Sequence, residues 1–163
     1  LKDKALIYSI SRQESGFNPR AKSYANAMGL MQVLPSTAAF IMKNRSYRYK
    51  SKKHLLYNVE ENLKIGTKYI KFLFGLNIVN NDVISMLASY NAGPGNFKKW
   101  TGNFNLIKKT DSLLLIETLP ARQTRNYIKL VLTNLWIYRS RLNEEPYMIP
   151  ALARGKKIKY IMR

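Results

Sequence analysis

The sequence predicts an all-α fold in a single domain. Apolar residues recur at steps of three and four in several segments, which is the spacing of one face of an α-helix. No segment alternates apolar and polar residues as a half-buried strand does. A chain of 163 residues with 46% hydrophobic residues is long enough for one ordinary core and short for two. We therefore treat residues 1–163 as one domain.

The first expected helix carries Leu6, Ile10 and Glu14 at i, i+4 and i+8. Gly16 and the pair Asn18-Pro19 end it. A short helix is expected at 36–44, because Pro35 is a favoured first residue. The segment 44–53, rich in Ser, Tyr, Arg and Lys, is expected to be a basic loop and not a domain linker, since apolar helices resume directly after it.

A second apolar stripe runs through 63–74 and includes Gly66, which indicates close packing of this helix against a neighbour. The turn Asn80-Asn81 precedes an expected helix at 82–91, and shorter helices are expected at 95–100 and 111–118. The longest helix is expected between Pro120 and Pro146. Its stripe consists of Ile128, Val131, Leu132, Leu135, Tyr138 and Leu142.

The composition favours an acidic partner. The 28 Lys and Arg residues against 9 Asp and Glu residues give a formal net charge of +19, and such a field attracts polyanions. Nucleic acid, an anionic membrane surface and a cell-wall polymer all fit, and charge alone does not choose among them. Many cations lie in 43–53 and near the C-terminus, at Lys156, Lys157 and Lys159. Each of them also fits an ordinary solvated surface.

Several classes are disfavoured. With no cysteine and only His54, the chain has no Cys/His zinc site, which argues against metal-dependent peptidoglycan amidases. No apolar run reaches the roughly 18 residues of a membrane-spanning helix, and no signal-peptide pattern opens the chain. Because the first residue is Leu1, we expect a fragment of a longer protein, and the compartment must be inferred from function.

Glu14 is the first candidate for chemistry. It continues an apolar stripe and lies at the end of a helix, and partial burial and the negative helix pole both disfavour a charged carboxylate. A raised pKa would suit a general acid near neutrality. The alternative is a structural glutamate that reaches water, Arg12 or Arg20.

The stretch RQESGFNPRAKSYANAMGLMQVLPSTA, residues 12–38, contains an ES pair, a loop and a GLMQ segment followed by a proline. This pattern resembles the soluble lytic transglycosylase family. VEENLKIGTKYI at 59–70, with Asn62 and Gly66, and ASYNAGPGNFKKW at 88–100 are similar to its second and third motifs. IETLPARQTRNYIKLVL at 116–132 resembles the segment that enters the last helix. The four blocks occur in the family's order and cover most of the chain.

The resemblance implies a lysozyme-like helical domain of the goose-type or Slt kind, with a substrate groove. Glu14 would protonate the β-1,4 glycosidic oxygen between N-acetylmuramic acid and N-acetylglucosamine. It would then accept the proton of the muramyl 6-hydroxyl, whose attack on C1 leaves a 1,6-anhydromuramyl end. Besides catalytic Glu14, the implied substrate-binding residues are Ser15, Ser23, Met31, Gln32, Leu34, Tyr90, Asn91 and Gln123.

The implied reaction uses one carboxylate, whereas most glycosidases use two. No other acid lies between Glu14 and Leu34, and Glu60 and Glu117 remain possible partners. Phe17, Met31 and Leu34 could keep water from the site. Tyr90 could donate a hydrogen bond to Glu14 or to substrate, although a tyrosine in the core is the alternative.

Three residues depart from the family pattern. Asn26 stands where many relatives have glycine, and asparagine is the residue best able to replace glycine at positive φ. Gln123 replaces a glutamate implicated in substrate binding, so it can still form hydrogen bonds but carries no charge. Leu34 replaces a methionine with little change of volume.

The expected partners are peptidoglycan glycan strands and an anionic cell-envelope surface, with no nucleic acid, cofactor or metal. A monomeric catalytic domain, the C-terminal part of a longer protein in the bacterial periplasm or cell envelope, is expected. The alternatives are a hydrolytic goose-type muramidase, a basic nucleic-acid-binding protein, or an inactive peptidoglycan-binding module. A steep loss of binding with salt would support the nucleic-acid alternative, but no recognised reading motif is present.

Overall fold

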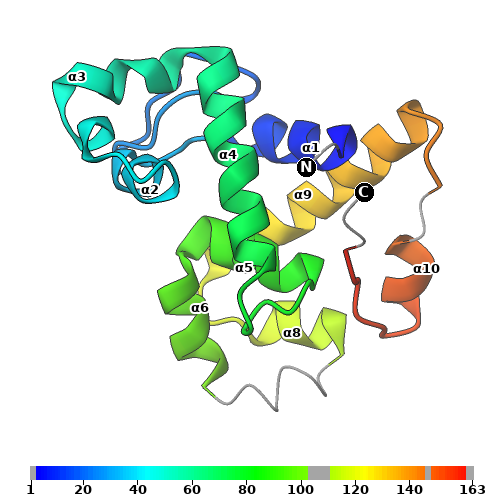
Figure 1. Cartoon of the computed structure of the whole chain (residues 1–163). Coiled ribbons are helices and arrows are strands. Elements are labelled where there is room, and N and C mark those ends of the chain that lie inside the picture. The colour runs from blue at the N-terminus through cyan, green and yellow to red at the C-terminus, as the bar shows by residue number, and fades with distance from the viewer. Residues whose placement is uncertain (1–2, 103–110, 146–147, 161–163) are drawn as a thin grey trace. The chain divides into compact units, whose positions relative to one another are not determined.

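The computed structural model describes residues 3–102, 111–145 and 148–160, and it is helical throughout (Figure 1). Within these residues, β structure is limited to isolated bridges, so the all-α prediction is confirmed. No helix in the described part of the chain is both long and apolar enough to cross a lipid bilayer. The chain divides into two compact units between Lys71 and Phe72.

The first unit opens with α1 (Lys4–Ser15), in which Leu6 and Ile10 are fully buried. The Asp3 carboxylate accepts a hydrogen bond from the Leu6 amide at 2.9 Å and caps the helix start. The remaining helices of this unit follow one another along the chain with short connections. They are α2 (Pro35–Ile41), the 3-10 helix η1 (Arg45–Arg48), α3 (Lys50–Lys53), the 3-10 helix η2 (His54–Tyr57) and α4 (Val59–Phe74), whose last turn enters the second unit.

The prediction of a basic loop at 44–53 is wrong, because this segment forms η1 and α3. Helix η1 packs against α2 and α3 (Figure 1). Among the described side chains of this segment only Tyr47 is buried. Helices this short need no apolar stripe, so the periodicity from which longer helices are predicted is missing here.

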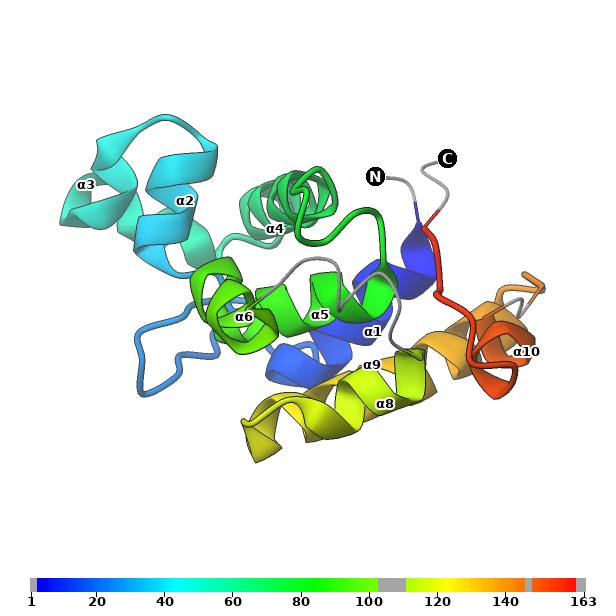
Figure 2. The same cartoon turned by 90° about the horizontal axis from the view of Figure 1, so that it is seen from below.

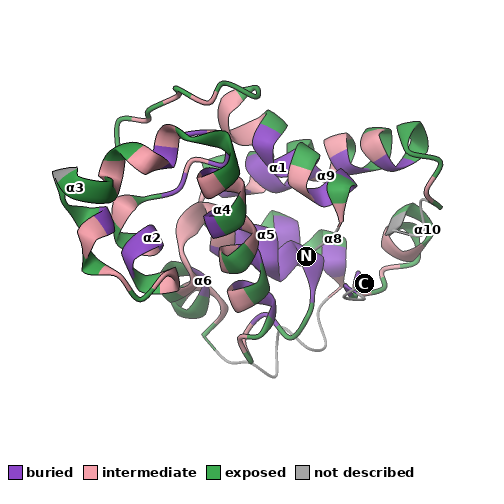
Figure 3. Ribbon diagram, turned by 45° about the horizontal axis from the view of Figure 1, so that its top comes forward, coloured by how far each residue is buried: buried purple, intermediate pink, exposed green. Residues whose placement is uncertain are grey.

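The second unit is built around α5 (Val83–Ala92). All residues from Val83 to Ser89 are buried, and this helix is purple along most of its length in Figure 3. Helix α9 (Arg122–Arg141) packs on α5 and on α8 (Ser112–Thr118), as Figure 2 shows for α8. The unit also contains α6 (Pro94–Thr101) and α10 (Met148–Ala153).

The ends of these elements are set by backbone geometry. Asn80 and Asn81 both adopt positive φ, which confirms the predicted turn before α5. The expected long helix is α9, but it stops at Arg141 and does not extend to Pro146, because Asn143 turns the chain at φ 55°. Helix α10 was not predicted.

Candidate active site

Glu14 lies in the last turn of α1 and is partly exposed, one helical step beyond buried Leu6 and Ile10. Gly16 ends the helix in the left-handed conformation, at φ 60°, and its amide donates to the Arg12 carbonyl at 3.0 Å. The predicted helix end is confirmed. The Glu14 carboxylate is thus carried by the last turn of a helix that is buried along one face.

Ser15 ties this helix end to the GLMQ segment. Its hydroxyl donates to the Leu30 carbonyl at 2.7 Å and also approaches the Ser11 carbonyl at 3.2 Å. The residue next to Glu14 therefore fixes the loop 16–34 relative to α1 through one side chain. In this structure Ser15 supports Glu14, and its predicted contact with substrate remains a prediction.

The loop is closed by its own hydrogen bonds. The Ser23 hydroxyl accepts from the Ala27 amide at 3.0 Å, and Asn26 between them adopts φ 63°. This is the left-handed geometry expected of an asparagine in a glycine position. The amide nitrogen of Gln32 donates to the carbonyls of Ala21 at 3.1 Å and Gly29 at 2.9 Å. Its amide oxygen is the atom that the predicted sugar contact would use.

Helix α4 supports the GLMQ segment through the side chain of Asn62, which is fully buried. Its side-chain oxygen accepts from the Met31 amide at 2.8 Å, and its nitrogen donates to the carbonyls of Met28 at 2.9 Å and Leu56 at 2.7 Å. From the sequence, Asn62 was recognised only as a residue of the second motif. Its buried position could have been inferred because it lies four residues before Gly66, on the apolar stripe of the same helix.

Two glycines allow this close approach. A Cβ on Gly29 would lie 2.1 Å from the Leu56 carbonyl oxygen and 2.4 Å from the Asn62 side-chain nitrogen. A Cβ on Gly66 would lie 2.4 Å from the sulfur of Met31, which confirms that Gly66 serves close packing. Met31 itself is fully buried against α4, a placement that favours packing over contact with substrate.

Two other apolar residues of the loop, Leu34 and Phe17, are exposed. Leu34, just before Pro35, is 38% exposed, and so is Phe17, whose ring packs edge-on against Tyr8 with centroids 6.4 Å apart. Leu34 and Phe17 therefore present apolar surface, whereas Met31 does not.

In the second unit, Tyr90 and Asn91 occupy the last turn of α5 and are partly exposed. Gly93 at φ 86° ends this helix, as the motif predicted, and α6 begins directly after it. The hydroxyl of buried Thr124 donates to the Asn91 side-chain oxygen at 2.9 Å and joins α5 to the start of α9. Gln123, next to Thr124, is exposed. The structure thus brings Asn91 and the Gln123 segment to the same end of this unit.

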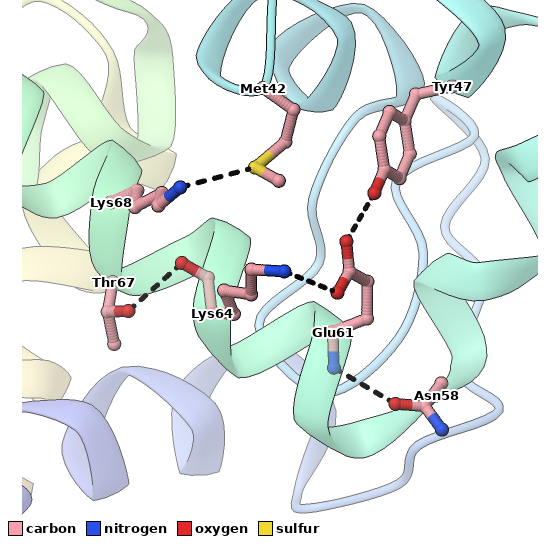
Figure 4. Close-up of polar contacts among 7 residues, drawn as sticks. All are labelled: Met42, Tyr47, Asn58, Glu61, Lys64, Thr67 and Lys68. Carbon is pink, nitrogen blue, oxygen red and sulfur yellow. Dashed lines mark hydrogen bonds and ion pairs between the residues drawn. The ribbon is translucent and has the colours of Figure 1, made fainter. Parts of the chain in front are cut away.

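Besides Asp3, which caps α1, the other carboxylates of the first unit are Glu60, exposed in the first turn of α4, and Glu61. Figure 4 shows Glu61 accepting hydrogen bonds from the Tyr47 hydroxyl and the Lys64 ammonium, the latter at 3.2 Å. The Tyr47 hydrogen bond, followed by Lys64, lowers the pKa of Glu61. In the second unit Glu117 pairs with Lys129 at 2.6 Å. The part of the chain that the structure describes contains no cluster of three His, Asp or Glu residues able to hold a metal ion.

The comparison with known families agrees with this arrangement. The family model described as the transglycosylase SLT domain matches residues 2–112, which include α1, the GLMQ segment and the α5–α6 turn. The chain belongs to the transglycosylase SLT domain family.

Relatives of this SLT domain are named as murein transglycosylases. The soluble lytic murein transglycosylase of Escherichia coli (strain K12) is 36% identical over 154 residues, which are 94% of this chain and 23% of that protein. Membrane-bound lytic murein transglycosylase C of Glaesserella parasuis is 33% identical over 141 residues, 77% of this chain and 39% of that protein. The SLT domain thus spans less than half the length of each of these two relatives.

The fold of the SLT domain matches solved structures. The 70 kDa soluble lytic transglycosylase of Escherichia coli superposes with a TM-score of 0.76 at 36% identity, over 87% of this chain and 22% of that chain. The lytic transglycosylase Slt of Pseudomonas aeruginosa gives a TM-score of 0.73 at 28% identity, over 96% of this chain and 24% of that chain. The predicted lysozyme-like helical fold is confirmed.

Proposed function

We propose that this SLT domain is the lytic transglycosylase part of a cell-wall enzyme, which cleaves the β-1,4 bond between N-acetylmuramic acid and N-acetylglucosamine and leaves a 1,6-anhydromuramyl end. The observation that carries the proposal is the position of Glu14 in the last turn of α1, where the next residue, Ser15, is hydrogen-bonded to the GLMQ segment. The names of the relatives support the same reaction.

In the proposed mechanism Glu14 acts twice. As an acid it protonates the glycosidic oxygen, while the muramyl N-acetyl group stabilises the cationic carbon. As a carboxylate it then takes the proton of the 6-hydroxyl of the same sugar, whose oxygen forms the new bond to C1. The nucleophile is already attached to the substrate, so its effective concentration is high and no second protein carboxylate is required.

The second unit contributes the predicted substrate contacts of Tyr90, Asn91 and Gln123. The hydrogen bond from Thr124 holds the Asn91 amide in one orientation, and a fixed amide can discriminate between donors and acceptors on a sugar. The Gln123 amide supplies hydrogen bonds without charge, so it contributes less to cationic intermediates than a glutamate would.

The proposed setting is the bacterial cell envelope, in the periplasm, with peptidoglycan strands as the partner. Named relatives include both soluble and membrane-bound murein transglycosylases, which supports this compartment. The domain is proposed to act as a monomer, without a cofactor and without a role in nucleic-acid binding.

The rival function is hydrolysis of the same bond, as in a goose-type muramidase. Mass spectrometry separates the two reactions, since hydrolysis leaves reducing ends heavier by one water, about 18 mass units. The relatives' names favour the anhydro product.

The test is Glu14→Gln, assayed on purified sacculi by release of anhydromuramyl products. We expect activity to fall by about 10²–10⁴-fold, since the amide can neither donate nor accept the required proton. The Pseudomonas aeruginosa relative was solved as an inactive mutant with glutamine in place of one glutamate. Glu60→Gln, at an exposed glutamate of the same unit, is the matched control and should retain activity. Anhydromuramyl release by folded Glu14→Gln would overturn the mechanism.

A further inference from the structure

The first unit contains a cationic pocket of about 570 Å³ at the C-terminal end of α2. None of the predicted site residues lines it. The pocket is formed by the end of α2, the turn after it and the outer side of η1. Its polar and aromatic lining consists of Phe40, Lys43, Asn44, Arg45, Arg48 and Tyr49.

Backbone geometry brings three cations together here. Arg45 and Arg48 are three residues apart in a 3-10 helix, where side chains at i and i+3 lie above one another. Lys43 adopts φ 51°, which turns the chain sharply between α2 and η1. Tyr47, between the two arginines, is buried and bonds to Glu61 on α4. One side of η1 therefore packs inward, and Arg45 and Arg48, both exposed, line the pocket on the other.

These cations are not needed to hold the local fold. Three carbonyls in the last turn of α2 accept from backbone amides, Ala38 from Met42 at 2.9 Å, Ala39 from Asn44 at 3.0 Å and Phe40 from Lys43 at 3.2 Å. A cationic side chain is therefore not required to cap this helix.

No ion pair within the described residues joins Lys43, Arg45 or Arg48 to Glu61, Glu117 or Glu144, which pair with Lys64, Lys129 and Arg139. The sequence contains no acid between Glu14 and Glu60, and Glu61 is already bonded to Tyr47 and Lys64 (Figure 4). Like charges held close together repel one another, so a bound external anion would reduce the repulsion among the three cations.

The shape and lining of the pocket indicate which anion fits. Guanidinium groups bind carboxylates in a planar, two-pronged geometry. Two apolar rings accompany the cations, since Phe40 is 58% exposed and Tyr49 is 66% exposed. Such rings pack against the aliphatic parts of peptides and the faces of sugars. A carboxylate on a peptide or glycan matches both features, whereas a bare ion would leave the rings exposed.

We propose that this pocket is an accessory binding site for the free carboxylates of peptidoglycan peptides, which keeps the domain on its polymer independently of the residues that cut it. The proposal rests on the proposed function, because peptidoglycan is the polymer on which it places the domain.

The test measures binding and not cleavage. The full chain carrying Glu14→Gln is mixed with intact sacculi, with glycan strands from which the peptides have been removed enzymatically, and with anionic phospholipid vesicles. It is compared with the same chain carrying Arg45→Gln and Arg48→Gln. The matched control carries Lys71→Gln and Arg141→Gln, which remove the same charge from two exposed cations on α4 and α9. Circular dichroism verifies that each variant is folded.

We expect the pocket variant to bind intact sacculi about tenfold or more weakly, and the control variant to change by less than about threefold. On peptide-free strands the parent and the pocket variant should converge. Equal losses in pocket and control variants, an undiminished difference on peptide-free strands, or a pocket-dependent difference confined to vesicles would each overturn the proposal. A failure of the proposed function would show separately, as the absence of anhydromuramyl products from the Glu14-intact chain.

Discussion

Tyr47 and Glu61 form a charge-assisted hydrogen bond between η1 and α4 (Figure 4). Burial, followed by the neighbouring Glu61, raises the pKa of Tyr47 from 10.0 to about 12. The hydrogen bond from Tyr47 is the main cause that lowers the pKa of Glu61 below 4.5. Each residue thus holds the other in the protonation state that keeps the bond, a neutral phenol and an ionised carboxylate.

Tyr47→Phe should remove this bond with little change of shape. We expect the free energy of unfolding to fall by about 1–2 kcal/mol at neutral pH, since the partner carboxylate is partly solvated. The stabilisation from Glu61 is present above its unfolded pKa and is lost as pH falls through its lower folded pKa. The stabilisation from Tyr47 is present below pH 10.0 and is lost as pH rises toward about 12.

The difference in urea stability between parent and variant should therefore be largest between these limits and shrink on both sides. Tyr24→Phe is the control, because Tyr24 is fully exposed and should show no such profile. A difference that stays constant from acid to alkaline pH would mean that the two groups are not coupled as the structure indicates.

At the level of elements, α4 is the support of the loop that follows Glu14. The Asn62 side chain accepts from the Met31 amide and donates to the carbonyls of Met28 and Leu56. Met28 and Met31 lie about thirty residues earlier in the chain, and Leu56 lies on η2. Gly29 and Gly66 leave space for this contact. The GLMQ segment is therefore positioned by a helix about thirty residues later in the chain, and α1 is joined to that segment by Ser15.

Asn62→Ala should release this loop. The Met31 amide and the Leu56 carbonyl lose the bond to Asn62, and the Met28 carbonyl keeps only the bond from the Val33 amide at 3.0 Å. We expect a loss of about 2–4 kcal/mol in the free energy of unfolding. Hydrogen exchange at the Met31 amide, which bonds directly to Asn62, should accelerate more than exchange in α9. Asn96→Ala removes a single exposed bond to the Ala92 carbonyl and should have little effect. Equal losses in the two variants would show that Asn62 does not support the loop.

The sequence predicted the long helices correctly but missed the single-turn helices of segment 44–53. Most of the apolar residues in the stripes of α1, α4 and α9 are buried, and a repeat over several turns shows up in the sequence. Segment 44–53 was predicted wrongly, since η1 and α3 are a single turn each and are held by tertiary contacts such as Tyr47–Glu61. The end of α9 at Asn143 was also missed, because asparagine is compatible with both a helix and a turn.

For the candidate site, the sequence indicated which loops matter but not how they are supported. Gly66 and Asn26 were predicted correctly because their backbone demands are specific. Two of the three bonds of Asn62, to Met31 and Met28, and the pairing of Thr124 with Asn91 join residues more than thirty positions apart. A single sequence does not reveal such pairs. Met31 was expected at the substrate because of its motif, and this contact stays a prediction; its side chain is fully buried beside Gly66.

At the scale of the whole molecule, the net charge of +19 should govern how the domain reaches its polymer. Sacculi carry peptide carboxylates, and a strongly positive protein is drawn to them over a distance set by the salt concentration, about 10 Å at 0.1 M. We expect the rate of binding to intact sacculi to fall about tenfold or more between about 0.05 M and 0.3 M sodium chloride. Binding to a neutral chitin oligosaccharide, measured under the same conditions, should change much less, because it has no charge to screen. A similar dependence on salt for both ligands would mean that salt acts on the fold of the domain and not on its attraction to an acidic polymer, and circular dichroism across the same salt series would reveal that change directly.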